Sequence, residues 1–460
     1  MLDTKLKRAV RSRQHLKRFK ALPRGLAVPL RHFRPLALLS TATTTMLLLA
    51  ACGGTGGGAS AGGASQFSLT INDDNHIVQQ ELTKLSTGAC TTQNQALSLQ
   101  IQTVPIGNVD QKVQLLAGQS ALPVQFAAGN APALTKTLDK AGQVLNLETT
   151  LKSLGVWDDI QPAAIKTVQN LYGKFNVMPY QFNIEGIWYN KKLFAQHGVA
   201  VPTNYDELVA AAAKFKAAGV IPFSASGQAG WPITRLISGY LYRELGPDAL
   251  QAVANGKAKL TDPAYVKAAQ AIADLGKAGY FGQGVGSIDY DTSVQQFITG
   301  KAAMFYMGSW ELGDFNDATK DQIGAANIGF MPFPTVAGGQ GSADQIPANV
   351  GLPVAVSAKS YNAKVGDWLG CITKNYGAAS LKDQGTISGF KPNGDAGSLP
   401  PLTQLVQTTI NQTSTSVLWF EALFNTKATE TSQTNAAPLV TGSISAQQFM
   451  QKVQDDLATG

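Results

Sequence analysis

Residues 67–71, Phe67-Ser68-Leu69-Thr70-Ile71, alternate apolar and polar side chains and predict a β-strand. A helical pattern follows at 77–85, and a second strand is expected at 97–104. The alternation repeats with a helix at 109–117 and a third strand at 122–126. Strands that alternate with helices of this length favour βαβ units, in which helices cover both faces of a parallel sheet. This stretch therefore predicts an α/β fold.

The same alternation continues through the rest of the chain. Thr203-Asn204-Tyr205-Asp206 has the residues of a helix start and precedes apolar residues at helical spacing. Residues 232–278 are expected to be helical, with breaks at Gly246-Pro247 and Asp262-Pro263. Further strands are predicted at 221–223, 302–306, 328–330 and 350–356, and further helices at 364–375 and 445–457. No linker divides this part cleanly, so we expect a pair of domains between which the chain passes more than once.

The first 52 residues have the features of an export signal. A basic stretch at 1–35 is followed by an apolar run at 36–51 and then by Cys52. The apolar run is short for a transmembrane helix, which needs roughly 20 residues, so a short membrane anchor is the less favoured alternative. The segment Leu49-Ala50-Ala51-Cys52 resembles the lipobox of bacterial lipoproteins. That resemblance implies that 1–51 is removed and that Cys52 carries the lipid that anchors the exported chain to the membrane.

The residues after Cys52 and the charge of the chain agree with export. Residues 53–63 are all Gly, Ala, Ser or Thr, so 52–65 is expected to be a lipidated cysteine followed by a flexible tether. The net charge of +7 comes from the signal: residues 1–51 hold 11 of the 37 basic residues and one of the 30 acidic ones. The rest of the chain has a net charge of −3 and no Lys/Arg cluster, which argues against nucleic-acid binding.

Two cysteines remain once Cys52 is assigned to the lipid. Cys90 and Cys371 form an even pair in an oxidising compartment, where a disulfide is possible. Two separate buried thiols explain the pair nearly as well. The low cysteine content excludes a small disulfide-stapled fold, so the exported chain has to fold on apolar cores of its own.

The segment Pro179-Tyr180-Gln181-Phe182-Asn183-Ile184-Glu185-Gly186-Ile187-Trp188-Tyr189-Asn190-Lys191-Lys192-Leu193-Phe194 resembles the central signature of extracellular solute-binding proteins of the maltose-binding-protein type. Further segments resemble motifs of this family and follow in the expected order, at 199–208, 297–304, 308–312, 329–334, 350–357 and 442–445. The resemblance spans residues 66–458.

This resemblance implies a two-lobe fold with a hinge and a ligand cleft between the lobes. The chain would be a monomer that captures a carbohydrate and delivers it to the membrane subunits of an ABC-type permease. The implied segments are 66–179 and 348–400 for the first lobe, 184–345 and 401–460 for the second, and 180–183 and 347–349 for the hinge strands.

A sugar-binding site needs flat aromatic faces, so the six tryptophans are the first candidates. Trp231 follows a glycine-rich loop that opens a helix, where binding residues concentrate. Trp310 follows Gly308-Ser309 in the motif that resembles the family's cleft tryptophan, and Trp419 lies where related proteins place another stacking aromatic. Trp188 and Trp368 fall in strand and helix patterns and are expected in the core.

Short polar side chains near strand ends would bind the sugar hydroxyls. Asp74 and Asn75 follow the first strand and Asn130 follows the third, and ligands of open α/β sheets lie at these carboxyl ends. Asn183 and Glu185 lie beside the predicted hinge. Turns and helix caps are the alternative explanation for all five residues, since Asp and Asn favour both.

Two other functions are considered. A secreted glycan-cleaving enzyme would need paired carboxylates, but the exported part contains no nucleophile, zinc or phosphate-binding motif. We therefore expect a non-enzymatic protein without a cofactor or metal. The same fold could instead bind a polyamine or another small solute, with Asp74, Glu185 and Glu311 supplying the charge.

Overall fold

The computed structural model describes residues 64–73, 76–105, 108–128, 132–413 and 415–459. The expected signal at 1–51, the lipid-bearing Cys52 and most of the tether lie outside these residues. So do three candidate ligand-binding residues, Asp74, Asn75 and Asn130. Within the part that is described, no helix is both long and apolar enough to cross a membrane.

The first sheet has five strands in the order β2-β1-β3-β10-β4. β1 pairs in parallel with β2 and β3, whereas β10 is antiparallel to β3 and β4. The strand bounds are β1 Phe67–Asn72, β2 Leu99–Val104, β3 Gln125–Ala127, β4 Val177–Met178 and β10 Val354–Val356. The sequence thus predicts the parallel β-α-β start of the chain correctly.

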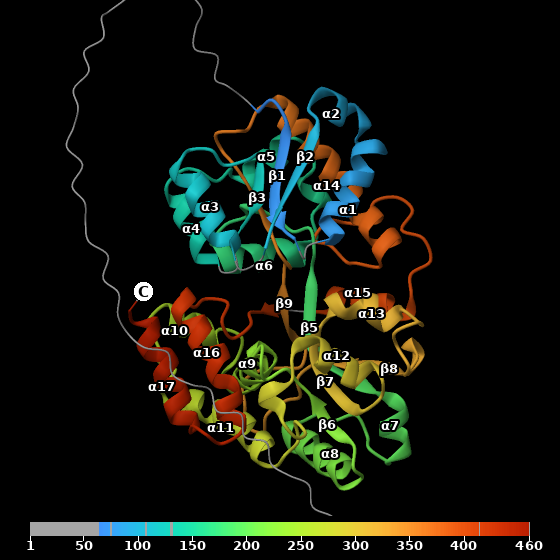
Figure 1. The fold of residues 1–460 in the computed structure, drawn as a ribbon, viewed down its shortest axis with the longest axis vertical. Helices are drawn as coiled ribbons and strands as arrows, with labels where there is room; N and C mark the ends of the chain where they lie inside the picture. Colours follow the sequence, from blue (N-terminus) through green and yellow to red (C-terminus); the bar gives the residue numbers. More distant parts are fainter. Residues whose placement is uncertain (1–63, 74–75, 106–107, 129–131, 414, 460) are drawn as a thin grey trace, which may run out of the picture. The chain divides into compact units, whose positions relative to one another are not determined.

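Helices lie on both sides of the first sheet (Figure 1). α1, α2 and α14 pack together on one side, and α3 and α4 lie on the other. Their bounds, with those of α5 and α6, are α1 His76–Thr87, α2 Thr91–Ala96, α3 Val109–Gly118, α4 Pro132–Lys140, α5 Leu147–Ser153, α6 Pro162–Tyr172 and α14 Ala363–Gln384. Trp368 of α14 is fully buried, stacks on Phe67 at 4.9 Å and donates its indole N–H to the Leu97 carbonyl, which confirms its expected core position.

The second sheet has the strand order β11-β9-β5-β7-β6, with β8 also paired to β5. Its central strand β5 is antiparallel to β7, β8 and β9. The bounds are β5 Asn183–Asn190, β6 Ile221–Ser224, β7 Ala302–Gly308, β8 Ile328–Met331, β9 Gln345–Asn349 and β11 Thr415–Val417. Trp188 of β5 is fully buried, as expected, and its indole donates to the Met307 carbonyl at 3.0 Å.

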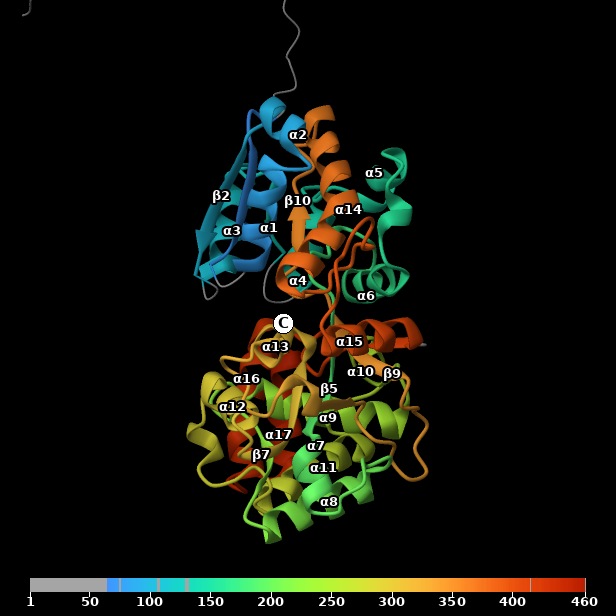
Figure 2. The ribbon, with the colours of Figure 1, turned by 90° about the vertical axis from the view of Figure 1, so that its right-hand side faces the viewer.

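Helices from two distant parts of the chain cover the second sheet. Figure 2 shows α11, α16 and α17 grouped together, and these three helices pack on one another, with α9 against α11 and α16. The bounds are α7 Lys191–Gln196, α8 Tyr205–Ala217, α9 Trp231–Leu245, α10 Ala249–Ala254, α11 Pro263–Lys277, α12 Tyr290–Ile298, α13 Leu312–Asn316, α15 Pro401–Gln412, α16 Thr426–Val440 and α17 Ala446–Leu457.

The chain passes between the two sheets three times: from β4 to β5, from β9 to β10, and from α14 to α15. The structure thus has two sheets that are linked by repeated crossings of the chain, and the division into a pair of domains stays a prediction. The residue bounds proposed for the two lobes stay a prediction.

One predicted strand, 350–356, is wrong in its first half. β9 ends at Asn349 and β10 begins only at Val354. Gly351 has a φ of +63°, which a strand does not allow, and its N–H is bound by the Asn349 side-chain oxygen at 2.9 Å. This turn ends one sheet and lets the chain enter the other.

Cys90 and Cys371 form a disulfide, with their Cα atoms 5.9 Å apart and a sequence separation of 281. Both cysteines are buried, Cys90 just before α2 and Cys371 in α14. The bond therefore fastens the N-terminal part of the first sheet's helical layer to a helix that arrives much later in the chain.

We expect the Cys90→Ser/Cys371→Ser variant to lose about 2–5 kcal/mol of unfolding free energy, because cross-linking distant residues restricts the unfolded chain. Denaturant unfolding of oxidised and reduced protein measures this. Reduction should lower the midpoint of the native protein and leave the double variant unchanged, and equal midpoints for native and variant proteins would contradict the expectation.

Candidate ligand-binding site

Three aromatic side chains form one corner on elements of the second sheet. Trp231 begins α9, Tyr290 begins α12, and Trp310 lies in a 3-10 turn, Ser309–Glu311, directly after β7. The Trp231 ring is 5.8 Å from both the Trp310 ring and the Tyr290 ring, and the indole N–H of Trp310 donates to the Tyr290 hydroxyl at 2.9 Å. All three side chains are partly exposed. They therefore form a fixed wall with free aromatic surface.

Two glycines allow this wall to form. The Trp310 ring folds back on Gly308, where a Cβ would come within 1.9 Å of the indole. Gly230, just before Trp231, has a φ of +74°, and a Cβ there would meet the Gln433 carbonyl at 2.0 Å. Any larger side chain at either position would displace the neighbouring tryptophan or its helix.

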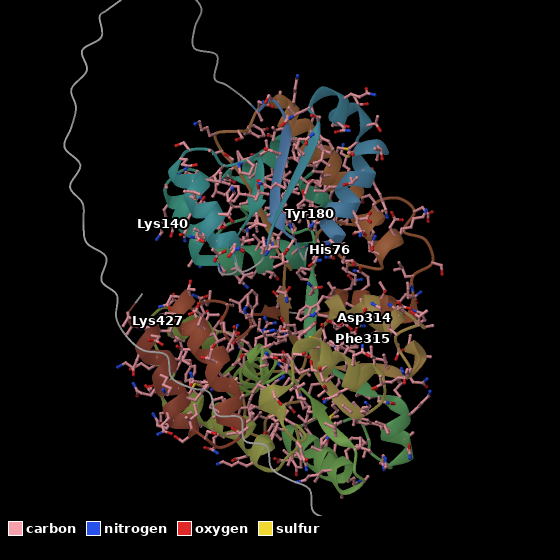
Figure 3. All side chains as sticks on the ribbon, viewed as in Figure 1. His76, Lys140, Tyr180, Asp314, Phe315 and Lys427 are labelled. Carbon is pink, nitrogen blue, oxygen red and sulfur yellow. A yellow bond between two sulfur atoms is a disulfide. The ribbon has the colours of Figure 1, made fainter. Side chains whose placement is uncertain are left out.

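A cavity of about 700 Å³ lies against two of these three rings, those of Tyr290 and Trp310. Tyr290, Trp310 and Glu311 line it, and further lining residues come from α12, from α13 and from α1 of the first sheet's layer. His76 of α1 and Asp314 of α13 are both among them (Figure 3). The cavity is thus bounded by elements of both sheets and has the size of a small-molecule site.

Glu311 is the buried acidic group of this cavity, with 7% of its surface exposed. The Tyr290 hydroxyl donates to one of its carboxylate oxygens. Burial raises the pKa of Glu311 to about 7, and repulsion from Asp314 and Asp291 adds to the effect. Burial and the Glu311 carboxylate also raise the pKa of Tyr290, so its hydroxyl keeps its proton and acts as the donor.

An ion pair also lies against Trp231. The Arg235 guanidinium is 4.8 Å from the Trp231 ring centre and 5.4 Å from that of Trp419, and it pairs with the fully buried Glu185. Burial lowers the pKa of Arg235, but Glu185 and Glu421 together raise it above its usual value. Arg235 therefore stays charged between the two indoles, where cation–π contacts hold it.

A second carboxylate, Glu421, is buried next to this ion pair and accepts hydrogen bonds from Thr234 and Ser432. Burial raises its pKa, and the charge of Arg235 opposes that shift. Burial also raises the pKa of the Tyr306 hydroxyl, and the negative charges of Glu185 and Glu421 raise it further. The interior behind the aromatic wall is thus polar and charged.

Asn183 and Glu185 are tied to the segment where β9 ends. Asn349 donates to Glu185 at 2.9 Å and accepts from the Asn183 amide at 3.2 Å. Ser309, the residue before Trp310, accepts from the Ile184 N–H at 3.2 Å. Asn183 and Glu185 are therefore neither turns nor helix caps, and these protein partners favour a supporting role. Their direct contact with a ligand stays a prediction.

Of the predicted ligand-binding residues, the structure brings Trp231 and Trp310 into contact and places the Trp419 ring against the Arg235 guanidinium. Trp157 packs on Phe175 at 5.0 Å, away from this group. Sequence reasoning missed Tyr290 and Arg235 as site residues. Arg235 follows Trp231 by four residues in a helical pattern, a spacing that places two side chains on one face, so it could have been found. Nothing in the sequence around Tyr290 separates it from the other tyrosines.

This arrangement can bind a flat, polar solute by stacking and hydrogen bonding. The aromatic faces take apolar C–H surface, while Glu311 and the Tyr290 hydroxyl offer hydrogen-bonding groups at the edge of the wall. Among the residues with a described structure, no group of three His, Cys, Asp or Glu side chains is placed to hold a metal ion.

These features define an α/β protein with two sheets and a cavity bounded by elements of both. The family model of bacterial extracellular solute-binding proteins matches residues 93–379, well over half of the chain. The chain belongs to this family, which confirms the resemblance seen in the sequence motifs and indicates an exported protein.

Two curated relatives and one solved structure illustrate the similarity. A probable sugar-binding periplasmic protein of Mesorhizobium japonicum is 29% identical over 44% of this chain, and a multiple sugar-binding protein of Streptococcus mutans is 29% identical over 41%. The chain spans about half of these relatives, 50% and 44% of their lengths. The structure of a chitin oligosaccharide binding protein superposes with a TM-score of 0.72 and 25% identity, over 86% of this chain and all of that one.

The raised pKa of Glu311 predicts a pH-dependent stability. Unfolding returns the carboxyl to its usual pKa near 4.5, so between about pH 4.5 and 7 the folded state holds a proton that the unfolded state releases. Stability should therefore fall as the pH rises through this window, by roughly 2–3 kcal/mol from this group. Urea unfolding at pH 5 and pH 7.5 measures the change. Glu311→Gln should remove that part of the slope, and an unchanged slope would contradict the assignment.

Proposed function

We propose that this chain is the carbohydrate-capturing component of an ABC-type importer. The observation that carries the proposal is the partly exposed corner of Trp231, Tyr290 and Trp310, of which Tyr290 and Trp310 line a cavity of about 700 Å³. A pyranose ring presents an apolar C–H face that stacks on indole and hydroxyls that need directional partners. A wall of three aromatic rings edged by Glu311 and the Tyr290 hydroxyl suits both parts of such a ligand.

The relatives support a carbohydrate rather than another solute. The two curated relatives are named for sugar binding, and the chitin oligosaccharide binding protein shares the fold over its whole length. All are named as binding proteins, so we propose that this chain binds without catalysis. In this proposal the loaded protein delivers its sugar to the permease subunits as a monomer, held at the membrane through lipid on Cys52.

A polyamine or another small cation is a weaker candidate for the main ligand. Glu185, one of the carboxylates that would serve it, is fully buried and already paired with Arg235 and Asn349. A cleft for a bare polyamine would need several free carboxylates around an aromatic box.

Removing one tryptophan ring of the aromatic wall should abolish most of the affinity for the sugar. The full chain, purified in a detergent without a sugar headgroup, is screened by thermal unfolding against mono- and oligosaccharides, polyamines and metal complexes. We expect a concentration-dependent rise in melting temperature with one sugar class. Trp310→Ala and Trp231→Ala should weaken binding at least about tenfold, close to 1.4 kcal/mol.

Trp157→Ala is the matched control, because Trp157 packs on Phe175 outside the site and its loss should leave the affinity unchanged. Shifts only with polyamines would overturn the carbohydrate proposal. Turnover of a glycan, detected as product, would overturn the non-enzymatic one.

Membrane attachment is tested separately through Cys52. The intact chain should fractionate with membranes after export, and Cys52→Ser should appear in the soluble fraction, because it lacks the residue that takes the acyl chains. Ligand affinity should be equal for both forms. Retention of Cys52→Ser on the membrane would favour the alternative of an uncleaved N-terminal anchor.

A further inference from the structure

Trp310, Tyr290 and the adjacent Glu311 form a second group, which we call the Trp310–Tyr290–Glu311 corner. The hydrogen bonds in this group all run in one direction. The indole N–H of Trp310 donates to the Tyr290 oxygen, and the Tyr290 hydroxyl donates to one oxygen of Glu311. Glu311 is therefore the final acceptor. Its other carboxylate oxygen has no hydrogen bond to any residue that the structure describes, although 93% of the residue's surface is buried and the side chain lines the cavity. A carboxylate oxygen without a protein donor at the edge of a cavity can accept from a ligand that brings a donor or a positive charge.

The charged groups around Glu311 come from every element that borders it. Asp291 of α12 and Asp314 of α13 are acidic, Lys320 after α13 pairs with Asp314 at 2.6 Å, and His76 faces the cavity from α1. Because Lys320 and Asp314 neutralise each other, Asp291 gives this cavity an excess negative charge, to which Glu311 adds at pH values above its pKa of about 7. Such a cavity attracts a cation and repels carboxylate and phosphate ligands.

Elsewhere in the protein, a carboxylate combined with two aromatic rings already binds a cation. Behind the wall, the buried carboxylate of Glu185 and the rings of Trp231 and Trp419 hold the cation of Arg235. On the cavity side, Glu311 and the rings of Trp310 and Tyr290 repeat these components. In the described part of the chain, Lys320 is the one lysine or arginine that lines the cavity, and it is engaged by Asp314.

We propose that the Trp310–Tyr290–Glu311 corner binds a sugar unit that carries a basic amine, with the ammonium group on the free oxygen of Glu311 and the ring face on Trp310. This inference rests on the proposed carbohydrate function and narrows it from sugars in general to amino sugars. It also excludes uronic acids and phosphorylated sugars as preferred ligands.

Proton linkage gives the proposal a distinct signature. A bound ammonium favours the ionised form of Glu311, whose pKa in the free protein is about 7. At lower pH the ligand has to displace a proton from Glu311, so affinity should fall as the pH drops from 7 to 5.5, by up to about fifteen-fold. His76→Gln, which changes a cavity-lining side chain on α1, should leave this pH dependence in place.

The experiment compares three oligosaccharides of equal length by titration calorimetry on the full chain. These are a glucosamine oligomer, its N-acetylated form and the corresponding glucose oligomer. At pH 7 we expect the glucosamine oligomer to bind at least tenfold more tightly than the other two. Glu311→Gln should abolish this preference, and Asp291→Asn should reduce it, whereas Glu430→Gln, an exposed carboxylate on α16 outside the cavity, should leave it unchanged.

The outcomes separate this inference from the proposed function. Equal or tighter binding of the neutral oligomers overturns the amine site and leaves carbohydrate capture standing. Absence of binding by every saccharide tested overturns the proposed function itself. If Glu311→Gln does not fold, the exposed residue Asp291 and the pH series on His76→Gln keep the test decisive. An amine preference that is unchanged in Asp291→Asn and from pH 5.5 to 7 would overturn the inference.

Discussion

The ion pair between Glu185 and Arg235 is the interaction on which the site depends. Glu185 lies on the central strand of the second sheet, is fully buried, and also accepts from Asn349 where β9 ends. Its negative charge is therefore compensated by Arg235 of α9 and by a hydrogen bond from Asn349 at the end of β9. A buried carboxylate without such partners would destabilise the fold by several kcal/mol, so the pair fixes α9 against the sheet. Because Trp231 lies one helical turn before Arg235, fixing the arginine also fixes the aromatic wall.

The buried polar groups next to Trp231 fix the orientation of the side chains around them, which an apolar core would not do. Glu421 and Tyr306 surround the Glu185–Arg235 pair, and the charge of Arg235 is shared between two carboxylates. Replacing a buried ion pair by well-packed apolar residues often leaves the protein as stable as before. What the ion pair adds is orientation, since the planar guanidinium is held between two indoles in one geometry. The tryptophan faces are thereby positioned before any ligand arrives.

Much of the fold follows from local patterns in the sequence, because strand alternation and helix starts are short-range signals. The crossings and the site depend on long-range contacts that such patterns do not contain. The strand expected at 350–356 illustrates this, since Val350 and Leu352 continue an apolar run while Gly351 turns the chain into the other sheet. Trp231 and Trp310 could be selected from their glycine context. Tyr290 could not, because its role comes from Glu311 and Trp310, which meet it only in the folded protein.

The turn at 308–311 connects the ligand wall to the crossing strands. Within four residues, Gly308 supports the indole, Trp310 forms the wall and Glu311 borders the cavity. The remaining residue, Ser309, accepts from the backbone of Ile184 and donates to Asn183, which is bound to Asn349. A ligand that fixes Trp310 therefore also restrains the start of β5 and the end of β9, which belong to two of the three segments through which the chain passes between the sheets. By thermodynamic reciprocity, a change in those segments that ligand binding favours or opposes has to change the affinity for the ligand in turn.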